Sequence, residues 1–334
     1  MKPLGSPERV RSGERKPVID NVSDTARWVA EYRARESARR DRLFSDPYAA
    51  ALAGERGRVI AEEARRGFGN GWFFIARTKL IDLLVEECVA EGCTRVINLA
   101  AGFDTRPYRL DLPSSLEWVE ADLPGIIEEK ERALAAEKPR CVLSRTAVDL
   151  TDADARRAFL TSATAGGGRT LVITEGLLLY LDASEVHALS ADLKSCRVTW
   201  WTADVIGPLI RRLSARASRE NNAPVVFAPD DGVAFFERAG WAVERVGTQL
   251  SAAAKWRRLS PLMRLVSRLP QADPRHPGNS LWSAVVRLRD PDSVGRSHQS
   301  SDRRPDQGAD QGPAQGADRS QGQSPDRRSG QGPA

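Results

Sequence analysis

Carboxylate side chains recur where short apolar segments of this sequence end. Asp104 follows the segment VINLAAG, and Asp122, Asp149, Glu175 and Asp204 lie at or just beyond the ends of later segments. A single acid in such a place is usually a helix cap or a turn residue. Ligands of open α/β sheets bind beyond the carboxyl ends of the strands. Five acids at corresponding ends would therefore form a ligand site that suits hydroxyl and cationic groups.

The loop after the first segment narrows the choice of ligand. Ala100, Ala101 and Gly102 are small, so a ligand can approach the main chain closely. A dinucleotide site favours the pattern G-x-G-x-x-G. Two of those glycines are missing here, and Asp104 stands where the pyrophosphate charges of NAD would lie, which disfavours NAD electrostatically.

S-adenosylmethionine has no phosphate, and it carries a ribose diol together with sulfonium and ammonium cations. Carboxylates suit all of these groups. The step of twenty residues from Gly102 to Asp122 fits an acid on ribose hydroxyls for either ligand, so this spacing does not discriminate between them. The missing glycines and Asp104 favour S-adenosylmethionine.

The elements that must position these residues alternate between strand and helix. Strands are predicted at 95–100, 116–121, 142–148, 170–175, 197–205, 241–247 and 281–288. Helices are predicted at 25–37, 72–92, 125–137, 152–164, 184–195 and 231–239, with helical insertions at 208–220 and 251–268 that could roof a pocket. The segment 43–54 is predicted to form a turn at Asp46-Pro47 and then a short helix. Asp24 or Ser23 is the expected N-cap of the first helix, and Gly92 is expected to end the third. This order predicts an α/β fold with a mixed seven-stranded sheet.

Composition excludes several function classes. The chain has 334 residues, is 28% charged and carries a formal charge of +5, and it has no basic run interleaved with aromatic residues, so no nucleic-acid partner is expected. Its apolar runs are shorter than the roughly 20 residues of a membrane helix. The first residues lack the apolar core of a secretory signal, so we expect a cytoplasmic protein without a membrane partner.

Metal chemistry is not expected either. The four cysteines form no C-x-x-C pair, and there are only three histidines. The cysteines are interpreted as small buried hydrophobic residues in a reducing compartment.

Both ends of the chain differ from its centre in composition. Residues 1–20 are rich in proline, glycine and charge, and residues 291–334 form a degenerate repeat without a large apolar residue after Val294. Such segments bury too little apolar surface to offset the entropy of ordering. We therefore expect a disordered N-terminus at 1–20, one domain at 21–290 and a disordered low-complexity tail at 291–334.

Six blocks of the sequence match a known family. They read TARWVAEYRARE with LFSDPYAA, RTKLID, VINLAAGFDTRPYRL, WVEADLPGIIEEK, AVDL and TEGLLLYL, in this order and spacing. The chain resembles the leucine carboxyl methyltransferase-like family of S-adenosylmethionine-dependent methyltransferases over roughly residues 20–290. That family includes many actinobacterial methyltransferases and polyketide O-methyltransferases.

The resemblance implies a class I methyltransferase fold, Rossmann-like, with helical cap insertions. It also implies cofactor-binding roles. Arg77 would hold the methionine carboxylate, and the main chain around Ala100 and Gly102 would pass beneath the cofactor. Asp122 would take the ribose hydroxyls, Asp149 and Leu150 would border the adenine, and Glu175 would lie near the methionine moiety. Arg27 is a looser candidate for a cofactor contact.

The resemblance further implies methyl transfer, with a carboxylate or hydroxyl oxygen of a small molecule as acceptor, such as a polyketide-like compound or a carboxylic acid. A carboxylate is ionised at pH 7 and needs no general base, whereas a hydroxyl does. The matched blocks contain no histidine to act as that base, which favours carboxylates or acidic phenols. Arg106, Arg211 and Arg212 are candidates to orient the acceptor, and no role is assigned to His187 or Tyr180.

Other interpretations stay open. Arg77 could pair with Asp82 or Glu86 on its own helix, and Arg106 could bridge the loop carboxylates. The competing classes are a non-catalytic S-adenosylmethionine-binding protein and an NAD-dependent oxidoreductase.

Overall fold

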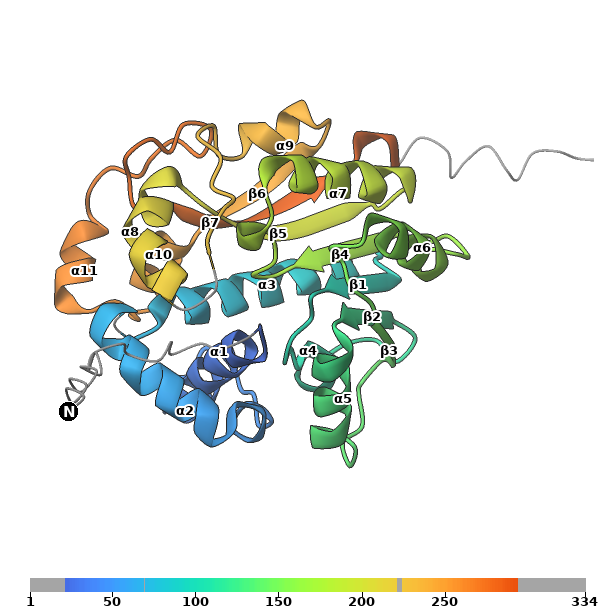
Figure 1. The fold of residues 1–334 in the computed structure, drawn as a ribbon, viewed down its shortest axis with the longest axis horizontal. Coiled ribbons are helices and arrows are strands. Elements are labelled where there is room, and N and C mark those ends of the chain that lie inside the picture. The colour runs from blue at the N-terminus through green and yellow to red at the C-terminus, as the bar shows by residue number, and fades with distance from the viewer. Residues whose placement is uncertain (1–21, 69, 221–223, 294–334) are drawn as a thin grey trace, which may run out of the picture. The chain divides into compact units, whose positions relative to one another are not determined.

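A computed structural model describes residues 22–68, 70–220 and 224–293 of the chain (Figure 1). The segment 1–20, for which we predict disorder, lies outside these residues. So does the predicted tail, except that Pro291–Ser293 forms a short 3-10 turn, η2.

The core of the fold is one seven-stranded sheet in the order β3-β2-β1-β4-β5-β7-β6. The strands are β1 (Arg95–Leu99), β2 (Glu117–Asp122), β3 (Val142–Ala147), β4 (Thr170–Thr174), β5 (Trp200–Ile206), β6 (Ala242–Thr248) and β7 (Ser283–Arg289). Neighbours among β1–β5 pair in parallel, and β7 runs antiparallel to both β5 and β6. The predicted mixed seven-stranded sheet is therefore confirmed.

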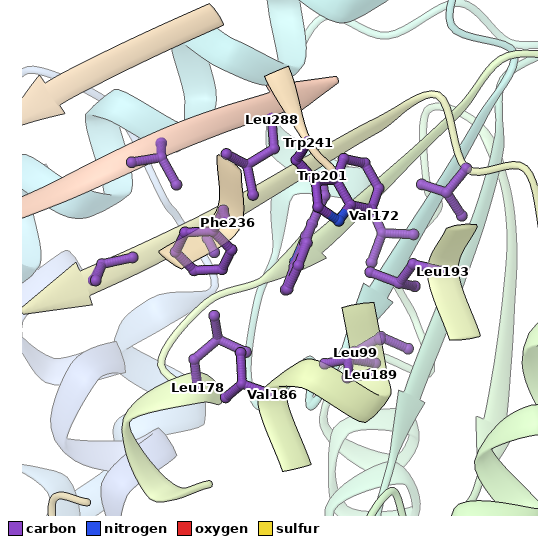
Figure 2. Close-up of a cluster of buried hydrophobic side chains, with 14 of the residues drawn as sticks. Leu99, Val172, Leu178, Val186, Leu189, Leu193, Trp201, Phe236, Trp241 and Leu288 are labelled. Carbon is purple, nitrogen blue, oxygen red and sulfur yellow. The ribbon is translucent and has the colours of Figure 1, made fainter. Parts of the chain in front are cut away.

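The sheet buries both of its faces. Side chains alternate across a strand. Ile97, Val172 and Trp201 therefore belong to one apolar cluster, and the residue just before each of them belongs to the other. The first cluster packs against α7 (Ala183–Ser195) and is shown in Figure 2. The second packs against α3 (Trp72–Ala90). Because the central strands are buried on both faces, they read as mostly hydrophobic runs in the sequence.

Shorter helices connect the strands. They are α4 (Arg106–Arg109), α5 (Pro124–Ala133), α6 (Ala153–Ala163) and α9 (Ala234–Arg238), with the 3-10 turn η1 (Leu178–Tyr180) after β4. Five further helices lie outside this alternation: α1 (Val22–Ser37), α2 (Ala49–Phe68), α8 (Pro208–Glu220), α10 (Gln249–Lys255) and α11 (Pro261–Val266). In Figure 1, α1 and α2 lie together below the sheet, and α8, α10 and α11 gather at its left end.

The predicted N-cap of the first helix is wrong, and two other helical segments differ in extent from the prediction. The first helix begins at Val22, so Asp24 is not its N-cap but lies in its first turn, where it pairs with Arg56 at 2.6 Å. The short helix predicted after the turn at Asp46-Pro47 is α2, which begins at Ala49 and continues to Phe68. The helical insertion predicted at 251–268 consists of α10 and α11, because Pro261 starts a new helix.

Candidate functional site

The carboxyl ends of β1–β5 open into a cavity of about 1410 Å³. Single-ligand pockets commonly measure about 300–1,000 Å³, so this cavity has room for two small molecules side by side. All seven residues predicted to bind cofactor line it: Arg77, Ala100, Gly102, Asp122, Asp149, Leu150 and Glu175. The structure thus brings together side chains that lie up to 98 residues apart in the chain.

The loop after β1 exposes its main chain to the cavity. Ala100 has a φ of 53° and Gly102 a φ of 49°, so both lie in the left-handed region, which costs an L-residue other than glycine roughly 1–2 kcal/mol. A Cβ atom added to Gly102 would lie 3.4 Å from the Cβ of Ala26 in α1. The small residues therefore permit a strained turn and a close approach of α1.

Asp122 ends β2 and is anchored by two main-chain groups. The N–H of Gly102 donates to its Oδ2 at 2.6 Å, and the N–H of Leu123 donates to its Oδ1 at 2.7 Å. Burial raises the pKa of this carboxyl, and the two N–H groups oppose that rise. Each oxygen has lone-pair capacity left for a further donor.

Asp149 and Leu150 lie at the rim after β3. Oδ1 of Asp149 accepts from the N–H and from the hydroxyl of Thr151, at 2.9 and 2.7 Å, and these hydrogen bonds lower the pKa of Asp149. The carbonyl of Leu150 accepts from Arg156 at 3.0 Å. Both residues are thus fixed at the cavity edge on the β3 side.

Arg77 reaches the cavity from α3 and is held between two acids. Its Nε donates to Oε1 of Glu175 at 2.9 Å, and its Nη1 donates to Oδ2 of Asp204 at 3.0 Å. Its guanidinium also lies 5.4 Å from the ring centre of Phe74. The alternative in which Arg77 pairs along its own helix is therefore wrong.

Glu175 connects Arg77 to a second arginine. Its Oε2 accepts from Nη1 of Arg106 at 2.8 Å, so both oxygens of this carboxylate are bonded to guanidinium groups. Burial alone would raise the pKa of Glu175, but the charges of Arg106 and Arg77 outweigh it and lower that pKa. Glu175 therefore stays ionised and fixes the two arginines relative to each other.

Arg106 is almost fully buried and bridges the loop carboxylates. This is the structural alternative to a role in orienting the acceptor. It donates to Asp82 and to Asp104 at 2.8 Å each, in addition to Glu175. Arg109 adds two further bonds to Asp82, at 2.7 and 2.8 Å. The guanidinium of Arg106 already donates to three carboxylates, so Arg106 is poorly suited to orient an acceptor.

These pairs join into one buried network. Its members are the four guanidinium groups of Arg33, Arg77, Arg106 and Arg109 and the five carboxylates of Asp46, Asp82, Asp104, Glu175 and Asp204. Five carboxylates against four guanidinium groups leave one negative charge in excess. A site with such an excess favours a cationic ligand over an anionic one.

Part of the cavity lining is aromatic. Trp28, Phe73, Phe74 and Tyr180 belong to this aromatic wall, and the rings of Trp28 and Phe74 meet edge to face with centroids 4.9 Å apart. Burial raises the pKa of Tyr180. An aromatic wall of this kind suits the apolar body of a second ligand.

Three other basic residues do not reach the cavity. Arg211 and Arg212 are exposed on α8, and Arg212 hydrogen bonds to Asn279. Arg27 pairs with Glu129 and with the carbonyl of Leu52. None of the three lines the cavity, so the structure gives no support to these candidates for acceptor orientation and for an additional cofactor contact.

The cysteines are mostly buried, and neither a metal cluster nor a membrane-spanning helix is found among the described residues. Cys88, Cys93 and Cys141 are buried as predicted, whereas Cys196 is only half-buried. Within the described residues, no group of three or more potential ligands could hold a metal ion. No helix in that part of the chain is long and apolar enough to span a membrane.

Known proteins with similar sequences are methyltransferases by name. The family model for leucine carboxyl methyltransferase matches residues 26–194. The chain belongs to the leucine carboxyl methyltransferase family. A relative from Frankia alni, named for S-adenosyl-L-methionine-dependent methyltransferase activity, is 33% identical over 70% of this chain and 87% of its own length. A relative from Streptomyces coelicolor with the same activity in its name is 32% identical over 71% and 89%.

Solved structures support the fold of this family member. A methyltransferase structure from Thermobifida fusca aligns with a TM-score of 0.50 at 16% identity, covering 82% of this chain and 96% of that one. A DUF574 family protein from Streptomyces avermitilis aligns with a TM-score of 0.51 at 12% identity, covering 80% and 97%. These likenesses confirm the predicted fold class.

Sequence reasoning missed some contributors to the site. The sequence identifies Asp204 as a strand-end acid but does not predict its pairing with Arg77. The aromatic wall gave no local signal, because Trp28 and Phe73 also fit the apolar faces of ordinary amphipathic helices.

Proposed function

We propose that this chain is an S-adenosylmethionine-dependent methyltransferase that methylates a carboxylate or hydroxyl oxygen of a small apolar molecule. One observation carries the proposal: the seven residues implied to bind cofactor line one cavity, which an aromatic wall also lines. Membership in the leucine carboxyl methyltransferase family supports the reaction class.

The donor groups of the cavity fit S-adenosylmethionine. Asp122 has acceptor capacity left for ribose hydroxyls after its two main-chain bonds. Nη2 of Arg77 has no hydrogen-bond partner among the described residues, so it is available to the methionine carboxylate. The excess negative charge of the buried network suits the ammonium and sulfonium groups.

When bound, S-adenosylmethionine supplies a methyl group on a sulfonium, and loss of that methyl leaves a neutral thioether. The residues of the chain contribute binding, orientation and exclusion of water. Asp122 and Arg77 would hold the two ends of the cofactor. Helix α1 packs against the loop after β1 through Ala26, where it would help to exclude water from a bound cofactor.

The aromatic wall would hold the acceptor. Arg33, Arg77 and Arg106 are the arginines among the described residues that line the cavity, and each is paired with at least one carboxylate. Orientation of the acceptor would therefore rest mainly on shape and apolar contact. A carboxylate acceptor would need no general base, and a hydroxyl acceptor would pass its proton to a carboxylate or to water.

Two alternatives make different demands on this cavity. NAD would bring two phosphate charges toward Asp104 and the negative network. A pyrophosphate usually binds at a helix N-terminus, but α4, the helix after the first loop, has only four residues. A non-catalytic S-adenosylmethionine-binding protein would use the same cofactor residues without transferring the methyl group.

The proposal is tested with S-adenosylmethionine labelled in its methyl group and a matched pair of apolar acceptors, 2-naphthoic acid and 2-naphthol, within a wider panel of acids and phenols. Label in an ester identifies a carboxylate acceptor, and label in an ether identifies a hydroxyl acceptor. If the protein binds S-adenosylhomocysteine but labels no member of the panel, the result contradicts the O-methyltransferase proposal and favours the non-catalytic alternative.

A further inference from the structure

Asp204 lies at the carboxyl edge of the sheet and bonds both to Arg77 and to the loop after β4. It lies inside β5, is 4% exposed and lines the cavity. Its Oδ2 accepts from Nη1 of Arg77 at 3.0 Å, and its Oδ1 accepts from the N–H of Gly176 at 2.6 Å. One carboxylate therefore ties a side chain of α3 to the main chain that follows Glu175.

The guanidinium of Arg77 is thereby restrained on most sides. Glu175 and Asp204 hold two of its nitrogens, and Phe74 lies 5.4 Å away at its ring centre. Gly176 has a φ of 70°, and a Cβ atom there would lie 3.5 Å from Nη1 and 3.7 Å from Nη2 of Arg77. Nη2 is left without a partner among the described residues, so the restraints present this nitrogen to the cavity.

The strand that carries Asp204 is rigidly held. β5 pairs with β4 on one side and with β7 on the other, and Asp204 lies opposite Val285. A carboxylate on such a strand can fix the direction of a long arginine side chain, whose free rotation otherwise opposes binding.

We propose that Asp204 is a positioning residue that aims Nη2 of Arg77 at the carboxylate of the cofactor's amino-acid moiety. This role rests on the proposed function, and it assigns recognition of the amino-acid end to a pair rather than to Arg77 alone. Asp204 itself makes no contact with that carboxylate, because two negative groups would repel each other.

Two nucleosides separate positioning from general structural damage. S-adenosylhomocysteine has the amino-acid moiety, whereas 5′-methylthioadenosine has the same adenosine and thioether without it. Calorimetry should show that Asp204→Asn weakens S-adenosylhomocysteine binding at least tenfold and changes 5′-methylthioadenosine binding less than twofold. Thr202→Val is the matched control, since Thr202 is buried on the same strand, does not line the cavity and has an unbonded hydroxyl. It should change neither affinity.

Two further variants guard against misfolding and test the pairing. Asp204→Glu keeps the charge that compensates Arg77 but displaces the carboxylate, and it should show the same selective loss. Arg77→Gln combined with Asp204→Asn leaves the local charge balanced, and its loss should not exceed that of Arg77→Gln alone, since both changes remove one interaction.

The outcomes distinguish the two claims. Suppose that wild-type protein binds S-adenosylhomocysteine. If the Asp204 variants then weaken binding of both nucleosides equally, or weaken binding of neither, the positioning role is wrong while the proposed function stands. If wild-type protein binds neither nucleoside, the proposed function fails and the positioning role fails with it.

Discussion

The main-chain N–H of Gly102 donates a 2.6 Å hydrogen bond to Oδ2 of Asp122, which joins the loop after β1 to the end of β2. The two residues are twenty positions apart, and they meet because β1 and β2 are parallel neighbours that end at the same edge. The bond holds the carboxylate at the cavity wall and leaves it further lone pairs, which we propose accept from the ribose hydroxyls of the cofactor.

Replacing Asp122 should separate binding from folding. In Asp122→Ala, we expect calorimetry to show at least a tenfold loss of S-adenosylhomocysteine affinity, because the ribose loses its acceptor. The two main-chain N–H groups also lose their partner, which should lower the free energy of unfolding by about 1–3 kcal/mol without abolishing the fold. Asp111→Asn, at an exposed acid outside the cavity, is the control. Retained affinity in Asp122→Ala would disprove the ribose assignment.

Ala100→Gly should stabilise the protein. Ala100 has a φ of 53°, which glycine adopts without strain. Part of the gain is offset because glycine has more freedom in the unfolded chain, so we expect about 0.5–1 kcal/mol in urea unfolding. Affinity for S-adenosylhomocysteine should be unchanged, since the loop offers its main chain. A clear loss of stability would mean that the alanine methyl packs favourably.

Acid should destabilise the buried network in a defined pH range. Burial opposes ionisation of Asp82, Asp104 and Glu175, but the neighbouring arginines outweigh it and lower all three pKa values. Their contribution to stability is therefore complete above the unfolded-state values, roughly pH 4, and is lost as the pH falls through the lower folded-state values. Urea unfolding between pH 7 and 2.5 should show a steep loss only at the acid end. A loss of similar size between pH 7 and 5 would contradict this account.

The cysteines should differ in reactivity. Burial raises the pKa of Cys88 to about 12 and the pKa values of Cys93 and Cys141 to about 11, so almost no thiolate forms at pH 8. Titration of the native protein with a thiol-specific chromogenic disulfide should show one faster thiol, the half-buried Cys196. Cys196→Ser should remove that phase, and a fast phase that persists in this variant would place a reactive thiol elsewhere.

Much of the sheet could be predicted from the sequence, because buried parallel strands carry continuous apolar runs. RVINL and TLVIT are mostly apolar in this way, and β1 and β4 end within one residue of their predicted limits. The seven proposed cofactor residues came from the resemblance, and they line one cavity because the strands end at one edge. Their individual contacts with cofactor remain predictions.

The helical cap could not be predicted as well. Glycines usually argue against a helix interior, yet α2 contains Gly54 at a kink and Gly57 within a helical turn. A Cβ atom on Gly57 would lie 2.8 Å from the carbonyl oxygen of Arg27, so this glycine lets α2 pack directly on α1. Such a requirement depends on tertiary contact, as does the pairing of Arg77 with Asp204, 127 residues away.

The central claim, that this cavity binds S-adenosylmethionine, is tested most directly by thermal unfolding of the full chain with S-adenosylmethionine, S-adenosylhomocysteine and NAD in parallel. A ligand that binds only the folded state adds about 2.7 kcal/mol of stability at 100 times its dissociation constant, which shifts the melting temperature measurably. We predict an upward shift with both adenosyl ligands and none with NAD. A shift with NAD alone, or no shift with any of the three, would contradict the claim.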